Sequence, residues 1–421
     1  MKLLELHILQ SFPVSCLNRD DAGIPKIAIF GGVTRARISS QCLKRAVREE
    51  AQTMNAGAFK GIRTKYIGQK LGDEVKKLQP NADPDCLSLA VEGALAAFGK
   101  VDEAAKDRIK ALYFLAPAEL RAVAAAVAAA LDDKPDDWSA YCTAKSKAGG
   151  QTPAEKAAPD KKAAKALDDA RKKLIDGVKR AAEKALRDCK GRLKDAIDIA
   201  LFGRMAADSP DLNIDGAACF SHALSTHEAE PQQDFYSAVD EVLREKMENR
   251  EEDAHAGSGM LGIIEFTSAT YYRYAALNLD MLFAKENGYL RDLAPAEQAG
   301  ALNSFIQAVV KAVPRARKTG MNAHTRPAYV LGCVRQHGGP VQLVNAFEAP
   351  VRAGDGGFVK TSVDKLLQHF CNVNEVWELD KDGNTLALAA TGEIRLQGGG
   401  TPEHLPISRF AEKLTEAAVP A

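Results

Sequence analysis

The chain has 421 residues, of which 46% are hydrophobic, and its 56 basic side chains balance 56 acidic ones. This length and apolar content exclude a chain that is disordered throughout, and they predict one large domain with insertions or a small number of ordinary domains. Because no apolar run reaches the ~18 residues of a membrane span and no basic leader precedes an apolar block, we expect a cytoplasmic protein that contacts no membrane.

The eight cysteines are scattered and form no C-x-x-C pair. We therefore expect reduced structural thiols, and neither a disulfide framework nor a bound metal or other cofactor. The net charge of zero does not exclude a nucleic-acid partner, because the distribution of charge over the surface decides such binding.

The predicted elements are strands near both ends of the chain with helices between them. In chain order they are a strand over 2–10, a polar loop over 11–26, a strand over 27–30, a helix starting at 39–40, helices over 85–131 and 154–203 with a linker over 132–160, an acidic arm with a glycine-rich tip over 228–262, a strand over 263–279, a helix over 295–312, a strand over 329–335 and a hairpin over 375–390. Alternating apolar residues indicate the first strand, and apolar residues three and four positions apart indicate the long helix. This order predicts an α+β fold.

Residues 22–48 form the first of two basic windows and contain no acidic residue. The cations of this window are Lys26, Arg35, Arg37, Lys44, Arg45 and Arg48. A helix from Ser39 would have a polar face made of Gln41, Lys44, Arg45 and Arg48. Like charges at this spacing weaken an isolated helix, and an anionic ligand would offset that. Because Ser39 and Ser40 lie at the helix start, the pattern favours a phosphate site, with an ordinary exposed basic helix as the alternative.

The second basic window, residues 298–347, also lacks acidic residues. Its densest part runs from Pro314 to Gly320 and contains Arg315, Arg317 and Lys318. Two acid-free basic windows within a neutral chain predict that the fold brings them into one positive groove.

Two further segments could carry chemistry. In the segment Gly203–Met205, Arg204 could hold a phosphate or stack on a base, and Met205 could wedge between bases or simply be part of the core. The adjacent Asp20 and Asp21 could hold Mg²⁺ in an enzyme, although aspartates in a polar loop are more often turn formers.

The same segments resemble the CasC backbone subunit family of type I-E CRISPR Cascade complexes. The matching residues are Ser15–Asp21, Ala28–Gly32, Arg35–Gln41, Leu43–Ala46, Asp198–Leu201, Gly203–Ala206, Phe235, Ala238–Asp240, Tyr272–Ala275, Asn278–Leu279 and Asn345–Glu348. They span roughly residues 1–50 and 195–350, while residues 55–190 and the tail beyond 355 have no match.

The resemblance implies an RRM-like (ferredoxin-like) palm with a helical fingers insertion and a protruding thumb. The implied domains are palm over 1–55, fingers over 56–195, palm over 196–227, thumb over 228–266, and palm with a C-terminal extension over 267–421. It also implies a non-catalytic subunit that binds CRISPR guide RNA, oligomerises along it and presents it for pairing with target DNA. The implied partners are guide RNA, target DNA, further copies of the chain, other Cascade subunits and a separate recruited nuclease.

The resemblance also implies roles for individual residues. Contacts with the guide backbone fall to Ser39, Ser40, Gln41, Lys44, Arg45 and Arg48, supported by Arg19, Arg35 and Arg37. Arg204 and Met205 match the site near a displaced nucleotide, and Met260 and Leu261 are candidates for the thumb tip. From charge alone, Lys26, Arg315, Arg317 and Lys318 join the RNA-binding set. Two alternatives remain open: an RNA-cleaving relative that uses Asp20 or Asp21, and a general single-stranded RNA binder.

Overall fold

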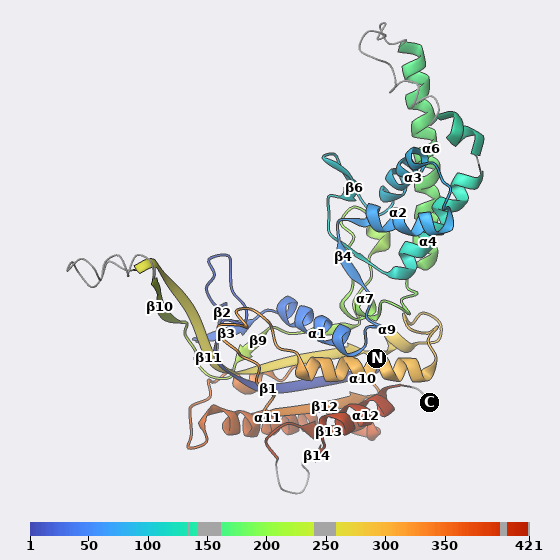
Figure 1. Cartoon of the computed structure of the whole chain (residues 1–421). Coiled ribbons are helices and arrows are strands. Elements are labelled where there is room, and N and C mark those ends of the chain that lie inside the picture. Colours follow the sequence, from blue (N-terminus) through green and yellow to red (C-terminus); the bar gives the residue numbers. More distant parts are fainter. Residues whose placement is uncertain (134, 142–160, 240–257, 396–401, 420–421) are drawn as a thin grey trace, which may run out of the picture. The chain divides into compact units, whose positions relative to one another are not determined.

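The computed structural model describes residues 1–133, 135–141, 161–239, 258–395 and 402–419 (Figure 1). Most of the predicted linker, residues 142–160, and the acidic run of the predicted arm, residues 241–253, lie outside these described residues. The chain divides into two compact units. The sheet unit comprises Met1–Met54, Ala218–Asp280 and Pro295–Ala421, and the helical unit comprises Asn55–Ala217 and Met281–Ala294.

The sheet unit is built on one mixed sheet, in which ten strands pair among the described residues. Its strands are β1 (Leu3–Ser15), β2 (Ile27–Phe30), β3 (Val33–Ile38), β8 (Ala218–Phe220), β9 (Ala223–Ser225), β10 (Gln232–Val239), β11 (Ser258–Asn278), β12 (Tyr329–Arg335), β13 (Thr385–Thr391) and β14 (Glu403–His404). The order is β14-β13-β12-β1-β11-β9-β3-β2, with β8 and β10 also paired to β11. Only the β13–β14 pairing among these is parallel.

Helices cover both faces of the sheet. They are α1 (Ser40–Met54), α10 (Pro295–Lys311), α11 (Gly357–Val376) and α12 (Ile407–Ala418), with α9 (Leu279–Phe283) at the boundary between the units. The α11 side chains Val363 and Phe370 share a core with Tyr272 of β11. On the other face, a Cβ at Gly332 would lie 2.5 Å from Leu414, so the missing side chain lets α12 approach β12 closely. The predicted α+β class is confirmed.

The central strand β1 is buried on both faces, although its sequence predicted one apolar face. The predicted face, which contains Leu6, is fully buried as expected. The opposite face buries Glu5 and His7 in a polar network, where Tyr274 Oη donates to Glu5 Oε1 over 2.6 Å and His7 Nδ1 lies 2.9 Å from Tyr272 Oη. Buried polar groups persist in a core when they are hydrogen-bonded, as these are.

This network predicts acid sensitivity of the sheet unit. Burial lowers the pKa of His7 from 6.5 to about 3, so only the unfolded chain takes up that proton between these pH values. The stabilisation is complete above pH ~6.5 and is lost as the pH falls, by about 2 kcal/mol at pH ~5. Denaturant unfolding at pH 7.5 and 5.0 measures this loss. In His7→Gln the same step in pH should cost less, and an equal loss in both proteins would contradict the assignment.

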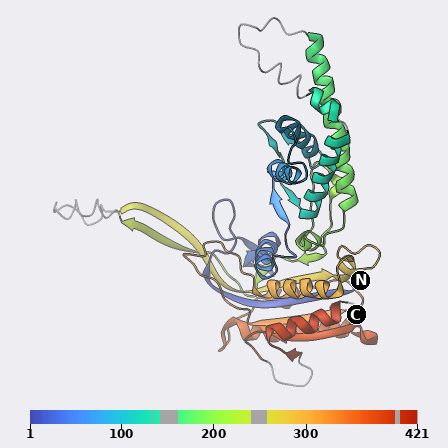
Figure 2. The same cartoon turned by 45° about the vertical axis from the view of Figure 1, so that its right-hand side comes forward.

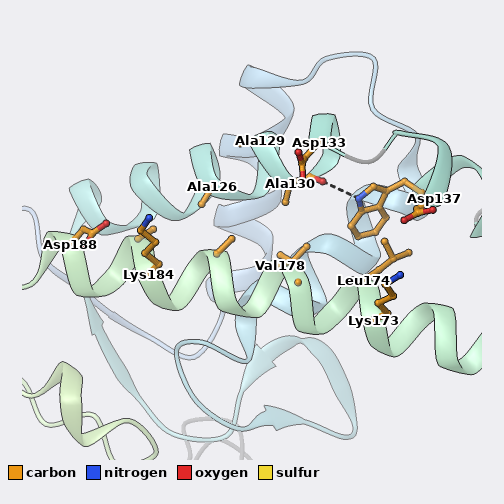
Figure 3. A pocket seen from close by; sticks show the side chains of 14 residues that line it. Ala126, Ala129, Ala130, Asp133, Asp137, Lys173, Leu174, Val178, Lys184 and Asp188 are labelled. Carbon is orange, nitrogen blue, oxygen red and sulfur yellow. Dashed lines mark hydrogen bonds between the residues drawn. The ribbon is translucent and has the colours of Figure 1, made fainter.

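The helical unit packs helices around its own apolar core. Its elements are β4 (Ile62–Thr64), α2 (Ile67–Leu78), α3 (Pro84–Leu95), β5 (Val101–Asp102), β6 (Ala105–Ile109), β7 (Tyr113–Leu115), α4 (Pro117–Asp133), α6 (Lys161–Cys189) and α7 (Ile197–Phe202). The core includes Leu71 of α2, Ala90 of α3, Val127 of α4 and Val178 of α6. Between α4 and α6 lies a hollow of about 580 Å³, whose lining includes five alanines (Figure 3). Trp138 also lines it, and its indole donates to the Ala130 carbonyl over 3.1 Å.

Three expectations from the sequence are wrong. Residues 85–131 are not helical throughout, because β5, β6 and β7 lie between α3 and α4. The hairpin expected over 375–390 is absent, since these residues comprise the end of α11, a short 3-10 turn and β13. Cys86 takes part in a disulfide bond, whereas six other cysteines are free thiols as expected.

Candidate nucleic-acid interface

The predicted basic helix is α1, and it is amphipathic as expected. Leu43, Ala46 and Val47 are buried, while Gln41 and Arg45 are exposed. The helix begins where predicted because Ser39 precedes it, with the Ser39 hydroxyl 3.4 Å from the Cys42 amide. Ser39 is itself buried, and its backbone N–H donates to Asn18 Oδ1 over 2.8 Å. Ser39 therefore ties the helix start to the loop after β1, and Ser40 is the more accessible hydroxyl.

The three cations of α1 differ in their exposure. The Arg45 side chain is 76% exposed and pairs with Glu49 over 2.8 Å, and this hydrogen bond raises the pKa of Arg45. An exposed pair of this kind contributes only ~0–1 kcal/mol, so Arg45 can exchange it for a phosphate. Lys44 Nζ lies 5.9 Å from the centre of the Phe220 ring, and Arg48 is partly buried.

A cleft of about 310 Å³ in the sheet unit joins the two basic windows. Its basic residues are Arg19 from the loop after β1, Arg45 from α1 and Arg315 from the loop after α10. The other residues that line it are Leu17, Asn18, Cys42, Ala46, Glu49, Pro314 and Ala316. Residues of both basic windows therefore line one cleft, as the sequence predicted. We call this site the basic cleft.

Nearby charges affect the pKa values of two cysteines, Cys42 and Cys16. Burial raises the pKa of Cys42, and the charges of Arg45 and Lys26 oppose that rise. Burial likewise raises the pKa of Cys16, against the charges of Arg317 and Arg19. Glu49 adds to the rise at Cys42, and Glu265 and Asp20 add to it at Cys16, so cations and carboxylates both surround the two thiols.

The loop that carries Arg315, Arg317 and Lys318 is a tight turn. Arg317 has φ = 50°, a left-handed conformation that is uncommon outside glycine, and its carbonyl accepts from Met321 N over 2.8 Å. Arg315 and Lys318 are exposed, whereas Arg317 is partly buried. The turn therefore presents two cations to solvent.

Lys26 directly precedes β2, and Arg37 lies in β3 of the β2–β3 hairpin. Arg37 Nε donates to the Ile27 carbonyl over 3.0 Å, and its NH1 lies 3.3 Å from His222 Nδ1. Burial, Arg37 and Lys26 together lower the pKa of His222, so this imidazole is neutral near pH 7. The cluster adds two fixed positive charges at the sheet edge.

Arg35 does not reach the surface, contrary to the expected supporting contact with RNA. It is fully buried, and its guanidinium donates to the carbonyls of Phe30, Ser225, Phe347 and Glu348. The turn between β2 and β3 also packs closely against Glu348, because a Cβ at Gly31 (φ = 61°) would lie 1.7 Å from the Glu348 carbonyl oxygen. Arg35 therefore fixes the β2–β3 hairpin in place.

Arg204 is also buried, within the helical unit. Its side chain is 0% exposed and forms an ion pair with Glu119, in which NH1 donates to the two carboxylate oxygens over 2.8 Å and 2.7 Å. Met205, by contrast, is 80% exposed, so it is not the core residue that its spacing allowed. Arg204 thus supports the segment from which Met205 projects, and no RNA could contact its guanidinium directly.

The predicted thumb is a two-stranded arm in which β10 pairs with the first part of β11, and it extends away from the sheet in both views (Figures 1 and 2). Phe235 and Ile263 lie directly opposite each other and are 66% and 62% exposed. Met260 is 58% exposed, and the Leu261 side chain lies outside the described residues. Sequence reasoning missed Phe235 and Ile263 as a pair of exposed apolar side chains, although the alternation along each strand could have indicated their shared face.

Asp20 behaves as a turn former. Its Oδ1 accepts from the backbone N–H groups of Ala22 and Ile24, over 2.9 and 3.0 Å, which is an Asx turn. Asp21 is exposed.

In the described residues, no helix is long and apolar enough to cross a membrane.

Two solved structures are similar to the chain over nearly its full length. One, "CRISPR RNA-guided surveillance complex, pre-nicking", has a TM-score of 0.71 and 24% identity and covers 99% of this chain and 100% of that chain. Another, "CRISPR RNA-guided surveillance complex", has a TM-score of 0.63 and 21% identity, with 99% of each chain covered. The fold is therefore that of a subunit found in CRISPR RNA-guided surveillance complexes.

The chain belongs to the CT1975-like protein family, whose model matches residues 4–403. This membership confirms the resemblance to the CasC family that the sequence motifs indicated. No curated protein matches the chain.

Proposed function

We propose that the chain is a non-catalytic, guide-RNA-binding subunit of a type I-E Cascade surveillance complex in the cytoplasm, and that copies of it assemble along one CRISPR RNA. In this proposal the sheet unit supplies an RRM-like palm, the helical unit supplies the fingers, and the arm of β10 and β11 is the thumb. The guide pairs with target DNA between thumbs, and a separately recruited protein cleaves that DNA.

The basic cleft is the observation that carries this proposal. Three arginines from separate segments, Arg19, Arg45 and Arg315, line it, and Lys318 lies exposed on the same loop as Arg315. Arginine suits phosphate because its planar fork can donate two parallel hydrogen bonds. Among the described residues, those that line the cleft include no aromatic side chain, which favours contacts with the backbone over base stacking. Such contacts are independent of sequence, as a guide of variable sequence requires.

The arm supports the displacement of a nucleotide. An exposed Phe235–Ile263 pair on a two-stranded ribbon is unfavourable in water, and apolar side chains that enter a base step unstack it. Met205 of the helical unit is a second exposed apolar side chain suited to an unstacked base. We propose that these side chains hold the guide in interrupted segments.

The double variant Phe235→Ser/Ile263→Ser should fold normally, because both side chains are exposed, yet fail to unstack the guide. A guide with 2-aminopurine at each position in turn should show a periodic fluorescence maximum with the wild type and a loss of most of that signal with the variant. Gln233→Ser, on the same face of β10, is the matched control. An undiminished periodic signal in the double variant would show that other residues displace the base.

Assembly on RNAs of increasing length tests the proposal as a whole. Mass photometry should show the number of bound chains rising by one for each fixed increment in RNA length. A single bound copy at every length would instead support a general single-stranded RNA binder, and metal-dependent RNA cleavage lost in Asp20→Ala would support the RNA-cleaving alternative.

A further inference from the structure

Arg273 of β11 is a buried cation that contacts the end of α10, before the loop that carries the densest part of the second basic window. The residue is 3% exposed, and its NH2 donates to the Val309 carbonyl over 2.7 Å. Val309 lies in the last turn of α10, where carbonyls have no partner within the helix and where the helix dipole is negative. Arg273 therefore binds the end of α10 at the point where the loop begins.

Gln10 of β1 extends this contact to the other end of the loop. Arg273 NH1 donates to Gln10 Oε1, and Gln10 Nε2 donates in turn to the Thr325 carbonyl over 2.9 Å. Thr325 Oγ1 also donates to the Ser11 carbonyl over 2.7 Å. Val309 and Thr325 bracket the segment with Arg315, Arg317 and Lys318, so one pair of side chains holds both ends of the basic loop.

Packing alone does not explain a guanidinium at this position. Both of its acceptors are neutral groups, and burial lowers the pKa of Arg273 to about 10, so the group is charged near pH 7. A buried cation with neutral partners is unfavourable compared with an apolar side chain of similar volume. What the guanidinium provides is a rigid fork that binds two acceptors from two different segments.

We propose that Arg273 and Gln10 are positioning residues that hold the loop of Arg315 and Lys318 beside Arg45 at the basic cleft. This inference rests on the proposed function, because it assigns the held loop to RNA binding. Neither residue lines the cleft, so both act through the loop.

We call the pair of Arg273 and Gln10 the clamp, and binding of a fixed single-stranded RNA tests its role in RNA binding. Arg273→Met and Gln10→Leu should each weaken binding by the folded protein about 10-fold, roughly the effect of losing the loop contacts. Combining Arg273→Met with Arg315→Ala/Lys318→Ala should weaken binding no further than the latter alone, since both remove the same contacts. Val363→Ala, a core truncation in the same unit, lowers stability without touching the clamp and should bind RNA normally. Fully additive losses, or clamp variants that bind as the wild type does, would overturn the inference.

Limited trypsin digestion separates the clamp from the proposed function, because it needs no RNA. Cleavage after Arg315 and Lys318 should be about 10-fold faster in both clamp variants than in Val363→Ala. If cleavage accelerates but Arg315→Ala/Lys318→Ala binds RNA normally, the clamp stands and the RNA role of the loop falls. If cleavage at the loop is unchanged, the clamp itself is refuted.

Discussion

Replacing Arg45, Arg315 and Lys318 with alanine together is expected to weaken binding of single-stranded RNA roughly 50-fold near ~0.15 M salt. Each side chain is exposed in or beside the basic cleft, and each phosphate contact on a single strand contributes roughly 0.7 to the slope of log K against log salt. The triple variant should therefore flatten that slope by roughly 2. Because phosphate contacts are independent of sequence, the loss should be equal for RNAs of different sequence. Fluorescence anisotropy across a salt series measures both quantities.

A control of equal charge separates the cleft from the overall charge of the protein. Arg352, Lys360 and Arg409 are exposed cations of the sheet unit that do not line the cleft. Arg409 also resembles Arg45 in forming an exposed helical pair, with Glu412 at 2.8 Å. Alanine at these three positions should leave the affinity within about threefold and the salt slope nearly unchanged. Equal losses in the two triple variants would mean that the basic cleft is not the RNA site.

Removing Glu119 is expected to be the most destabilising single change in the helical unit. Glu119→Ala leaves the Arg204 guanidinium buried without its carboxylate, and breaking a buried pair from one side costs about 3–5 kcal/mol. It also removes the acceptor of the Ala116 backbone N–H at the start of α4, where Glu119 completes a capping contact over 3.1 Å. The free energy of unfolding should recover most of this loss in Glu119→Leu/Arg204→Met, because no buried charge then remains.

The two tryptophans allow this loss to be assigned to one unit. Trp138 is 4% exposed in the helical unit, and Trp377 is 72% exposed in the sheet unit. In a Trp377→Phe background, Trp138 fluorescence reports unfolding of the helical unit alone. Glu119→Ala should lower the denaturant midpoint of this fluorescence transition. At the lowered midpoint, the secondary structure of the sheet unit should still be present. A loss below about 1 kcal/mol would show that Arg204 is not held by this pair and would restore it as a candidate RNA contact.

Local periodicity in the sequence predicted the elements that frame the basic cleft. Alternating residues in β1 and the four-residue spacing in α1 indicate one buried face each, and both elements begin within a residue or two of the predicted positions. The absence of acidic residues from two distant windows indicated a shared surface, and Arg45 and Arg315 do line one cleft. Patterns of this kind are visible in a sequence because each depends on neighbours in the same segment.

The burial of Arg35 and Arg204 could not be predicted in the same way. The acceptors of Arg35 include carbonyls of Ser225 and Phe347, and Glu119 lies 85 residues from Arg204 along the chain. In a sequence, an arginine therefore looks the same whether its side chain faces solvent or lies in a core. The wrong hairpin over 375–390 has a related cause, since the turn signal around Asp382–Asn384 indicated a strand on each side, whereas the end of α11 precedes it and β13 follows it.

The nucleic acid that accompanies the protein from its native host tests the central claim most directly. The account predicts short RNAs of one length class with a repeat-derived end, and several copies of this chain on each RNA. RNA of all lengths and sequences with one copy bound, or protein free of RNA, would contradict the assembly on a guide and leave the family membership as a statement of fold.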